Sequence, residues 1–118
     1  MNMIVFVLHD PEKLDEVLTA WEETGVGGIT ILPSTGLGRI RNHEGLREDM
    51  PLFPDLEDFF PHHKRTSRTL FTAVEGNELV AKVVEATQRV VGDLSQPDTG
   101  LLVVWPLAQV YGLDKKRG

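Results

Sequence analysis

The stretch Met3-Ile-Val-Phe-Val-Leu-His-Asp-Pro11 decides the fold of the first half of the chain. Its first six residues are apolar, with β-branched and aromatic side chains that are typical of a strand. Asp10 is a good helix N-cap, and Pro11 suits the first helical position because its missing N–H has no partner there. The stretch therefore predicts a strand over residues 3–8 that leads directly into a helix.

A single apolar helix face follows this cap. Four residues spaced i, i+3, i+4 and i+7 form it: Leu14, Val17, Leu18 and Trp21. Gly25 is placed to end the helix in the left-handed conformation. Residues 28–32 then predict a second strand, which Pro33 is expected to end.

The second half of the chain repeats this plan. Residues 69–74 predict a strand, and Asn77 is the expected N-cap of the next helix. The apolar face of that helix comprises Val80, Val83, Val84, Thr87 and Val91, and Gly92 is expected to end it. Residues 100–106 predict the last long strand, and residues 108–111 a short edge strand.

The order βαββαβ predicts a ferredoxin-like α+β sandwich, with an antiparallel sheet and both helices on one face. The strands at residues 3–8 and 100–106 are apolar at nearly every position, which indicates burial on both faces. In a chain this short, a second copy is the expected cover, so the pattern predicts a homo-oligomer. Trp21 and Trp105 are both expected in the core.

Composition narrows the function. A chain of 118 residues is expected to form one domain, residues 1–118, and its apolar runs are too short to cross a membrane. There is no cysteine and no signal-peptide pattern, which fits a cytoplasmic protein. The formal net charge of -6 argues against nucleic-acid binding.

Residues 39–68 show no helix or strand periodicity, and they hold half of the basic residues. A stretch of this length inside a small domain indicates a functional loop. Its ends join two strands that should pair, so five basic residues should meet at one end of the sheet: Arg39, Arg41, Lys64, Arg65 and Arg68. An anion at this base and a partner protein at the acidic tip would suit the pattern, as would an ordinary solvated mixture of charges. Residues 114–118 are expected to be a flexible tail.

Gly36, Leu37 and Gly38 follow the second predicted strand. Glycines allow backbone N–H groups to approach a phosphate or carboxylate closely, but a plain glycine turn explains the same pattern. The adjacent His62 and His63 lack the spacing of a metal site, and no metal is predicted. Ser, His and Asp show no catalytic arrangement beyond His9-Asp10, where Asp10 is better explained as a cap. The chain is therefore not expected to be an enzyme.

Three segments resemble the P-II signal-transduction superfamily: Gly28-Ile-Thr-Ile31, Thr35-Gly-Leu-Gly-Arg39 and Thr99-Gly-Leu-Leu-Val-Val-Trp-Pro-Leu107. The resemblance covers almost the whole chain. It implies a compact homotrimer with a large loop between the second and third strands. It also implies binding of ATP, ADP and 2-oxoglutarate in clefts between subunits, and docking of the loop on transporters, enzymes and regulators.

The resemblance assigns roles to individual positions only in part. It places Gly28 and Thr30 in an adenine pocket, and Gly36, Gly38 and Arg39 at the root of the loop. The family's Gly-x-Gly-Lys phosphate grip is reduced here to Gly100, with Leu101 in place of the lysine. The family's two C-terminal arginines have no counterpart in residues 109–113, so an adenine nucleotide is left open as a ligand and no cofactor is predicted.

The sequence thus predicts a trimeric P-II-like regulator that senses a small anionic ligand between subunits and docks a partner through residues 39–68. The alternative is a metal-associated ferredoxin-like trimer of the divalent-cation-tolerance type, which needs histidines and carboxylates that converge between subunits.

Overall fold

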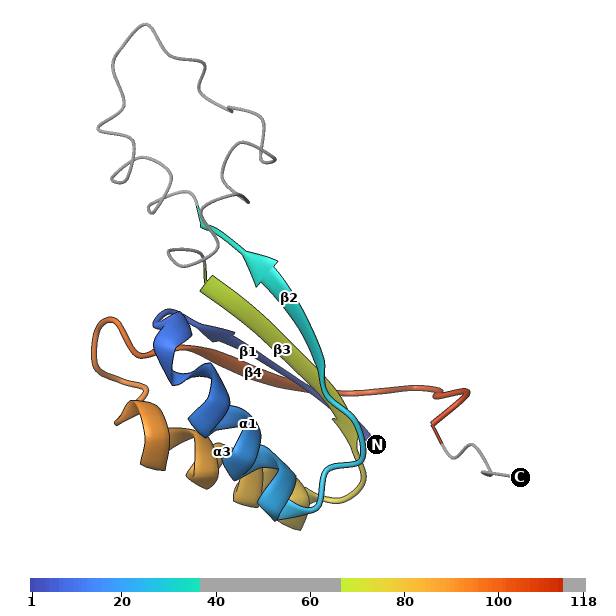
Figure 1. The fold of residues 1–118 in the computed structure, drawn as a ribbon. Helices are drawn as coiled ribbons and strands as arrows, with labels where there is room; N and C mark the ends of the chain where they lie inside the picture. Colours follow the sequence, from blue (N-terminus) through green and yellow to red (C-terminus); the bar gives the residue numbers. More distant parts are fainter. Residues whose placement is uncertain (37–66, 114–118) are drawn as a thin grey trace, which may run out of the picture.

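A computed structural model describes residues 1–36 and 67–113 of the chain. The elements follow in the order β1 (Asn2–Leu8), a 3-10 helix (Pro11–Lys13), α1 (Leu14–Thr24), β2 (Thr30–Ser34), β3 (Ser67–Val74), α3 (Asn77–Val91) and β4 (Gly100–Pro106). Both helices lie on one side of a four-stranded sheet (Figure 1). The predicted ferredoxin-like fold is confirmed.

The strand order in the sheet is β2-β3-β1-β4, and every neighbouring pair is antiparallel. β1 is central, with Val5 opposite Phe71 on β3 and opposite Val103 on β4. β2 and β4 therefore form the two opposite edges of the sheet. Residues that lie directly opposite one another share a face, so the register divides each strand into an inner row under the helices and an outer row.

The core lies between the inner face of the sheet and the two helices. Ile4, Phe6 and Leu8 of β1 alternate inward and are fully buried. The helices contribute Val17, Trp21 and Val83, and the Phe6 and Trp21 rings lie 6.4 Å apart between centroids. This is the packing that the predicted apolar helix faces required.

One polar contact lies inside this core. The Trp21 indole N–H donates to the Thr87 hydroxyl at 2.8 Å, and that hydroxyl donates to the Val83 carbonyl at 2.7 Å. Both groups are buried, so an unmade bond at either would cost free energy. The pair holds α1 and α3 in a fixed relation over the sheet.

The predicted start and end of the first helix are confirmed. The Asp10 carboxylate accepts a hydrogen bond from the Glu12 N–H at 3.0 Å, and Pro11 begins the short 3-10 turn ahead of α1. Gly25 ends α1 with a φ of 102°. The predicted cap of the second helix is wrong, because α3 already includes Asn77, and Gly76, with a φ of 88°, holds the capping position without a side-chain bond.

The predicted bounds of the second strand are also wrong. β2 runs from Thr30 to Ser34 and includes Pro33. Proline is tolerated there because β2 is an edge strand, where one side of the backbone needs no ladder partner. β3 begins at Ser67, so the last two residues of the predicted loop over 39–68 belong to a strand.

The predicted edge strand over residues 108–111 does not form within the described chain. The Leu107 N–H donates to the Met1 carbonyl at 2.9 Å, just beyond the end of β4. From there the backbone leads away from the sheet (Figure 1). Tyr111 is 86% exposed at this end of the chain.

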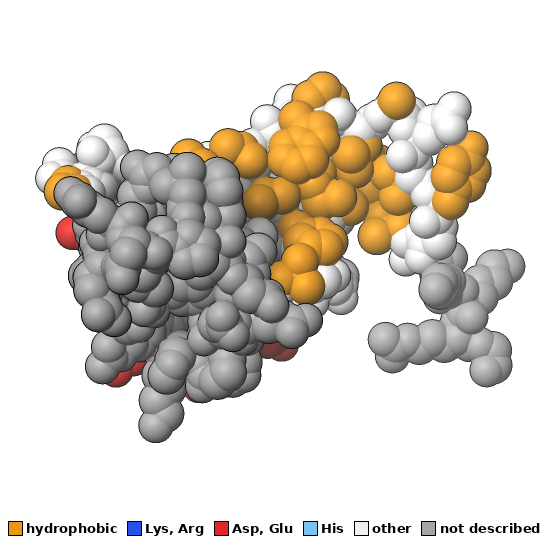
Figure 2. Space-filling view, turned by 90° about the horizontal axis from the view of Figure 1, so that it is seen from above, with side chains coloured by type: hydrophobic (Ala, Val, Ile, Leu, Met, Phe, Trp, Pro, Cys, Tyr) orange, Lys and Arg blue, Asp and Glu red, His pale blue; other side chains and the backbone are white. Residues whose placement is uncertain are grey.

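The outer face of the sheet is apolar, and neither helix of the described residues 1–36 and 67–113 packs on it. The outer row of β4 holds Leu101, Val103 and Trp105, which are 59%, 39% and 43% exposed. Figure 2 shows hydrophobic side chains gathered into one patch on the face that is turned to the viewer. The expectation of Trp105 in the core is wrong for the single chain, because its register with Met3 places it on this outer face.

Candidate functional site

Two of the predicted ligand residues, Thr30 and Gly100, lie at opposite edges of the sheet. Thr30 is on β2, opposite Phe71, and Gly100 is on β4, opposite Leu8. Two strands, β3 and β1, separate them. A single chain therefore cannot bring Thr30 and Gly100 around one small ligand, whereas two copies placed edge to edge could.

At the β2 edge, the backbone around Gly28 is held by a threonine of the neighbouring strand. The Thr72 hydroxyl donates to the Gly28 carbonyl, and Thr72 itself is buried. Gly28 and Thr30 are exposed, and no atom of the described residues lies within 4 Å of the position that a Cβ on Gly28 would take. The edge thus offers an open and anchored backbone, and the described part of the chain gives no steric reason for a glycine at position 28.

The root of the long segment is polar. The Thr69 hydroxyl donates to the Ser34 hydroxyl at 2.9 Å across β3 and β2. Arg68 donates from Nη1 to the Ser67 carbonyl at 3.2 Å, and its register with Leu8 and Pro33 places it in the inner row at the end of the sheet.

The described residues bring Gly36 and Arg68 to this end of the sheet, since β2 ends at Ser34 and β3 begins at Ser67. The other residues predicted for this cluster lie outside the described residues: Leu37, Gly38, Arg39, Arg41, Lys64 and Arg65. The same holds for His62, His63 and the rest of residues 39–66. Their convergence therefore stays a prediction.

At the β4 edge, packing explains Gly100. Its φ is 136°, and an added Cβ would lie 2.5 Å from the Val7 carbonyl oxygen and 2.7 Å from the Phe6 ring. Any larger residue would force the backbone of β1 or the buried Phe6 ring to move. Gly100 is thus required by the fold itself, whether or not a ligand contacts it.

Polar groups of the loop between α3 and β4 form hydrogen bonds with one another. The Asp93 carboxylate accepts bonds from the Ser95 N–H and hydroxyl, at 2.9 and 2.8 Å, which lower the pKa of Asp93 below its ordinary value. The Gln96 N–H donates to the Asp93 carbonyl, and the Thr99 hydroxyl donates to the Gln96 carbonyl. The loop is therefore a closed turn that carries a stable negative charge.

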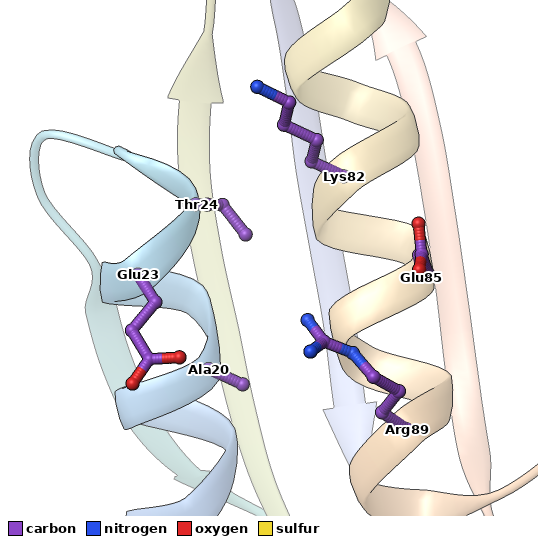
Figure 3. Close-up of a pocket in the computed structure, with 6 residues that line it drawn as sticks. All are labelled: Ala20, Glu23, Thr24, Lys82, Glu85 and Arg89. Carbon is purple, nitrogen blue, oxygen red and sulfur yellow. The ribbon is translucent and has the colours of Figure 1, made fainter.

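A surface groove of about 370 Å³ between the helices was not predicted from the sequence (Figure 3). Glu23 of α1 faces Lys82 and Arg89 of α3 across it, and Ala20, Thr24 and Glu85 complete the lining. Helical periodicity places these residues on the side of each helix away from the sheet. The groove is open and mixed in charge, as expected of a solvated helix surface.

Comparison with known proteins now identifies the family. A sequence profile described as "Nitrogen regulatory protein P-II" matches residues 1–117, nearly the whole chain. The chain belongs to the P-II family. Members of the P-II family are regulatory proteins and not enzymes, so the prediction of a signalling role without catalysis is confirmed at that level.

Two characterised relatives carry the same name. The "Nitrogen regulatory protein P-II" of Bradyrhizobium diazoefficiens is 34% identical over 79 residues, which cover 67% of this chain and 62% of that protein. The protein of the same name from Azospirillum brasilense is 31% identical over 100 residues, 85% of this chain and 80% of the relative. The match thus spans a little under two thirds of the first P-II relative and four fifths of the second.

The described residues contain neither a metal-binding cluster nor a membrane-spanning helix. No group of three or more His, Asp or Glu side chains in residues 1–36 and 67–113 is placed to hold a metal ion. Within these same ranges, no helix has the length and apolarity needed to cross a membrane.

Proposed function

We propose that this P-II family member acts as a homotrimeric regulator in the cytoplasm. It senses a small anionic ligand in clefts between copies, and it docks a regulated protein, a transporter or an enzyme, through residues 39–68. The family supports the regulatory role, and the resemblance described above supports the trimer and the loop. The observation that carries the proposal is the apolar outer face of the sheet, which neither helix of the described residues covers.

The apolar side chains of the outer face form one continuous surface across neighbouring strands. The outer rows of β1 and β4 place Val7 beside Leu101, Val5 beside Val103 and Met3 beside Trp105. β3 extends the surface with Phe71, opposite Val5. A continuous apolar surface of this kind on a soluble domain marks an interaction site, and association of identical chains buries it most economically.

The placement of the ligand residues supports the same assembly. Gly28 and Thr30 lie at the β2 edge, and Gly100 lies at the β4 edge. When copies associate through their sheets, the β2 edge of one copy can approach the β4 edge of the next. Each such junction would form a cleft with walls from two chains, and Arg68 lies at the end of the sheet beside the root of the loop.

The native mass of the protein tests the assembly. We expect three times the 13.2 kDa chain at micromolar concentration. Val103→Lys places a charge in the middle of the outer face and should shift the mass toward one chain. Ala81→Lys, on the exposed surface of α3, is the matched control and should leave the trimer intact. A wild-type monomer, or a Val103→Lys trimer, would contradict the proposal.

Titration calorimetry with a panel of small anions tests the ligand. We propose that the anion is held by the basic residues at the roots of the loop: Arg39, Arg41, Lys64, Arg65 and Arg68. Removing one charge-assisted hydrogen bond should weaken binding about tenfold or more. Binding that survives the double change Arg39→Ala with Arg65→Ala would show that the anion lies elsewhere.

A further inference from the structure

The loop from Asp93 to Leu101 determines which anions the proposed cleft can accept. It lies at the β4 edge, the side on which the P-II resemblance places a Gly-x-Gly-Lys grip for the phosphates of an adenine nucleotide. The structure allows this grip to be tested against the residues that are present. The inference rests on the proposed cleft between copies.

The segment that contains the loop carries only negative formal charges. Residues 90–113 contain Asp93 and Asp98 but no lysine or arginine. The hydrogen bonds from Ser95 stabilise the ionised carboxylate of Asp93 and lower its pKa. Polyphosphates are bound by cations and by backbone dipoles, and like charges close to them disfavour binding. The side chains of this segment therefore supply negative charge and no cation, whereas a triphosphate needs positive partners.

Several hydrogen-bond donors of the loop are already used inside it. A phosphate nest needs backbone N–H groups that point outward at the anion. Here the Leu94 N–H donates to the Gln88 side chain at 3.1 Å, and the Ser95 and Gln96 N–H groups both donate to Asp93. The hydroxyls of Ser95 and Thr99 also donate within the loop. The loop uses these donors to stabilise its own turn.

Gly100 is the one glycine of the loop that matches the family pattern. Gly100 is required by its contact with Val7 and Phe6, so its presence is no sign of a close approach by phosphate. Next to it, Leu101 is 59% exposed on the outer face, where the family pattern has a lysine. An apolar side chain there cannot neutralise a phosphate.

We infer that the Asp93–Leu101 loop excludes adenine nucleotides from the cleft, so that this chain has lost the polyphosphate site of its family. The loop is a self-bonded acidic turn in place of a phosphate grip.

Calorimetric titration of the intact wild-type protein with ATP and with ADP tests the inference, with native mass measured on the same samples. We expect no saturable binding up to about 1 mM nucleotide. Leu101→Lys restores the missing charge and should bind ATP about tenfold more tightly than Leu101→Gln, which is equally polar at the same position but uncharged. Submillimolar binding by the wild type, or Leu101→Lys no better than Leu101→Gln, would overturn the inference.

A second variant avoids the outer face, where a lysine could also weaken association. Asp98 is exposed in the loop with a φ of 65°, a conformation that asparagine accepts readily. Asp98→Asn removes one repelling charge and should strengthen ATP binding severalfold over the wild type. No gain in Asp98→Asn would count against charge exclusion. A monomeric wild type would refute the proposed trimer, whereas a trimer that binds ATP would refute only this inference.

Discussion

The two faces of one sheet differ in what covers them. On the inner face, Ile4, Phe6 and Leu8 are fully buried under α1 and α3. On the outer face, the same strand presents Met3, Val5 and Val7, which are only partly buried, beside the exposed outer row of β4. The residues are equally apolar on both sides. The two helices cover one face and not the other, a difference that sequence composition alone does not reveal.

The largest expected effect compares neighbours on β1. Phe6→Ala should lower the free energy of unfolding by about 3–5 kcal/mol, because the ring is fully buried and its loss leaves a cavity against Trp21. Val5→Ala, on the opposite face, should cost about 1 kcal/mol within a single chain. Urea unfolding at two protein concentrations measures both.

The concentration dependence separates the faces. The loss in Phe6→Ala should be the same at high and low protein concentration, whereas the loss in Val5→Ala should grow when association contributes to stability. Equal and concentration-independent losses in the two variants would mean that the outer face has no partner.

The next largest effect on stability is expected at Gly100, on the edge strand β4. Gly100→Ala introduces a Cβ 2.5 Å from a backbone oxygen of β1 and should destabilise the fold by about 1–3 kcal/mol. Gly27→Ala is the matched control, because no atom of residues 1–36 and 67–113 lies within 4 Å of its Cβ position. Thermal unfolding of both variants checks this, and a neutral Gly100→Ala would show that β4 can shift away from β1.

The two tryptophans provide a smaller comparison. Trp21→Phe loses the indole hydrogen bond to Thr87 and should cost about 1 kcal/mol beyond the change in packing. Trp105→Phe keeps an aromatic ring on the outer face and should leave the stability of a single chain unchanged. Fluorescence of the two single-tryptophan variants, followed on dilution, should change only where Trp105 is retained. A change in the signal of Trp21 on dilution would contradict this division.

The smallest expected effect is a change in how stability depends on pH. It arises from Asp93, which lies on neither face of the sheet. Hydrogen bonds from Ser95 hold the pKa of Asp93 below its ordinary value of 3.8 in the folded state. This carboxylate therefore contributes stability above the unfolded pKa and loses it as the pH falls through the folded pKa. Asp93→Asn should show less loss of stability than the wild type between about pH 6 and about pH 3. An identical pH profile would mean that Asp93 titrates as in the unfolded chain.

Periodicity and capping residues predicted most of the fold. The Asp10 cap, the Gly25 stop and the strand over residues 100–106 are all found where the sequence places them. The errors occur where sheet position overrides a local rule. Pro33 lies inside a strand because that strand is at an edge, and Trp105 is exposed because nothing in a single sequence says which face of a sheet the helices will cover.

The candidate site was less predictable, since it depends on contacts that are distant in sequence. Gly100 matches a ligand pattern, yet its reason lies in Phe6 and Val7, more than ninety positions earlier in the chain. The groove between α1 and α3 was missed because its residues show only the ordinary polar side of two helices. The acidic side chains before β4 were visible from the start, but the hydrogen bonds that close their loop were not.

The separation of Thr30 and Gly100 on opposite edges has a genetic consequence. In the proposed trimer each cleft takes one wall from each of two subunits, so a chain damaged only in its β2 wall and a chain damaged only in its β4 wall would each be defective alone. Mixed rings of the two would contain some junctions built from two intact walls. Co-expression of two such inactive alleles should therefore restore part of the ligand response, a form of complementation that a site held within one subunit would not permit.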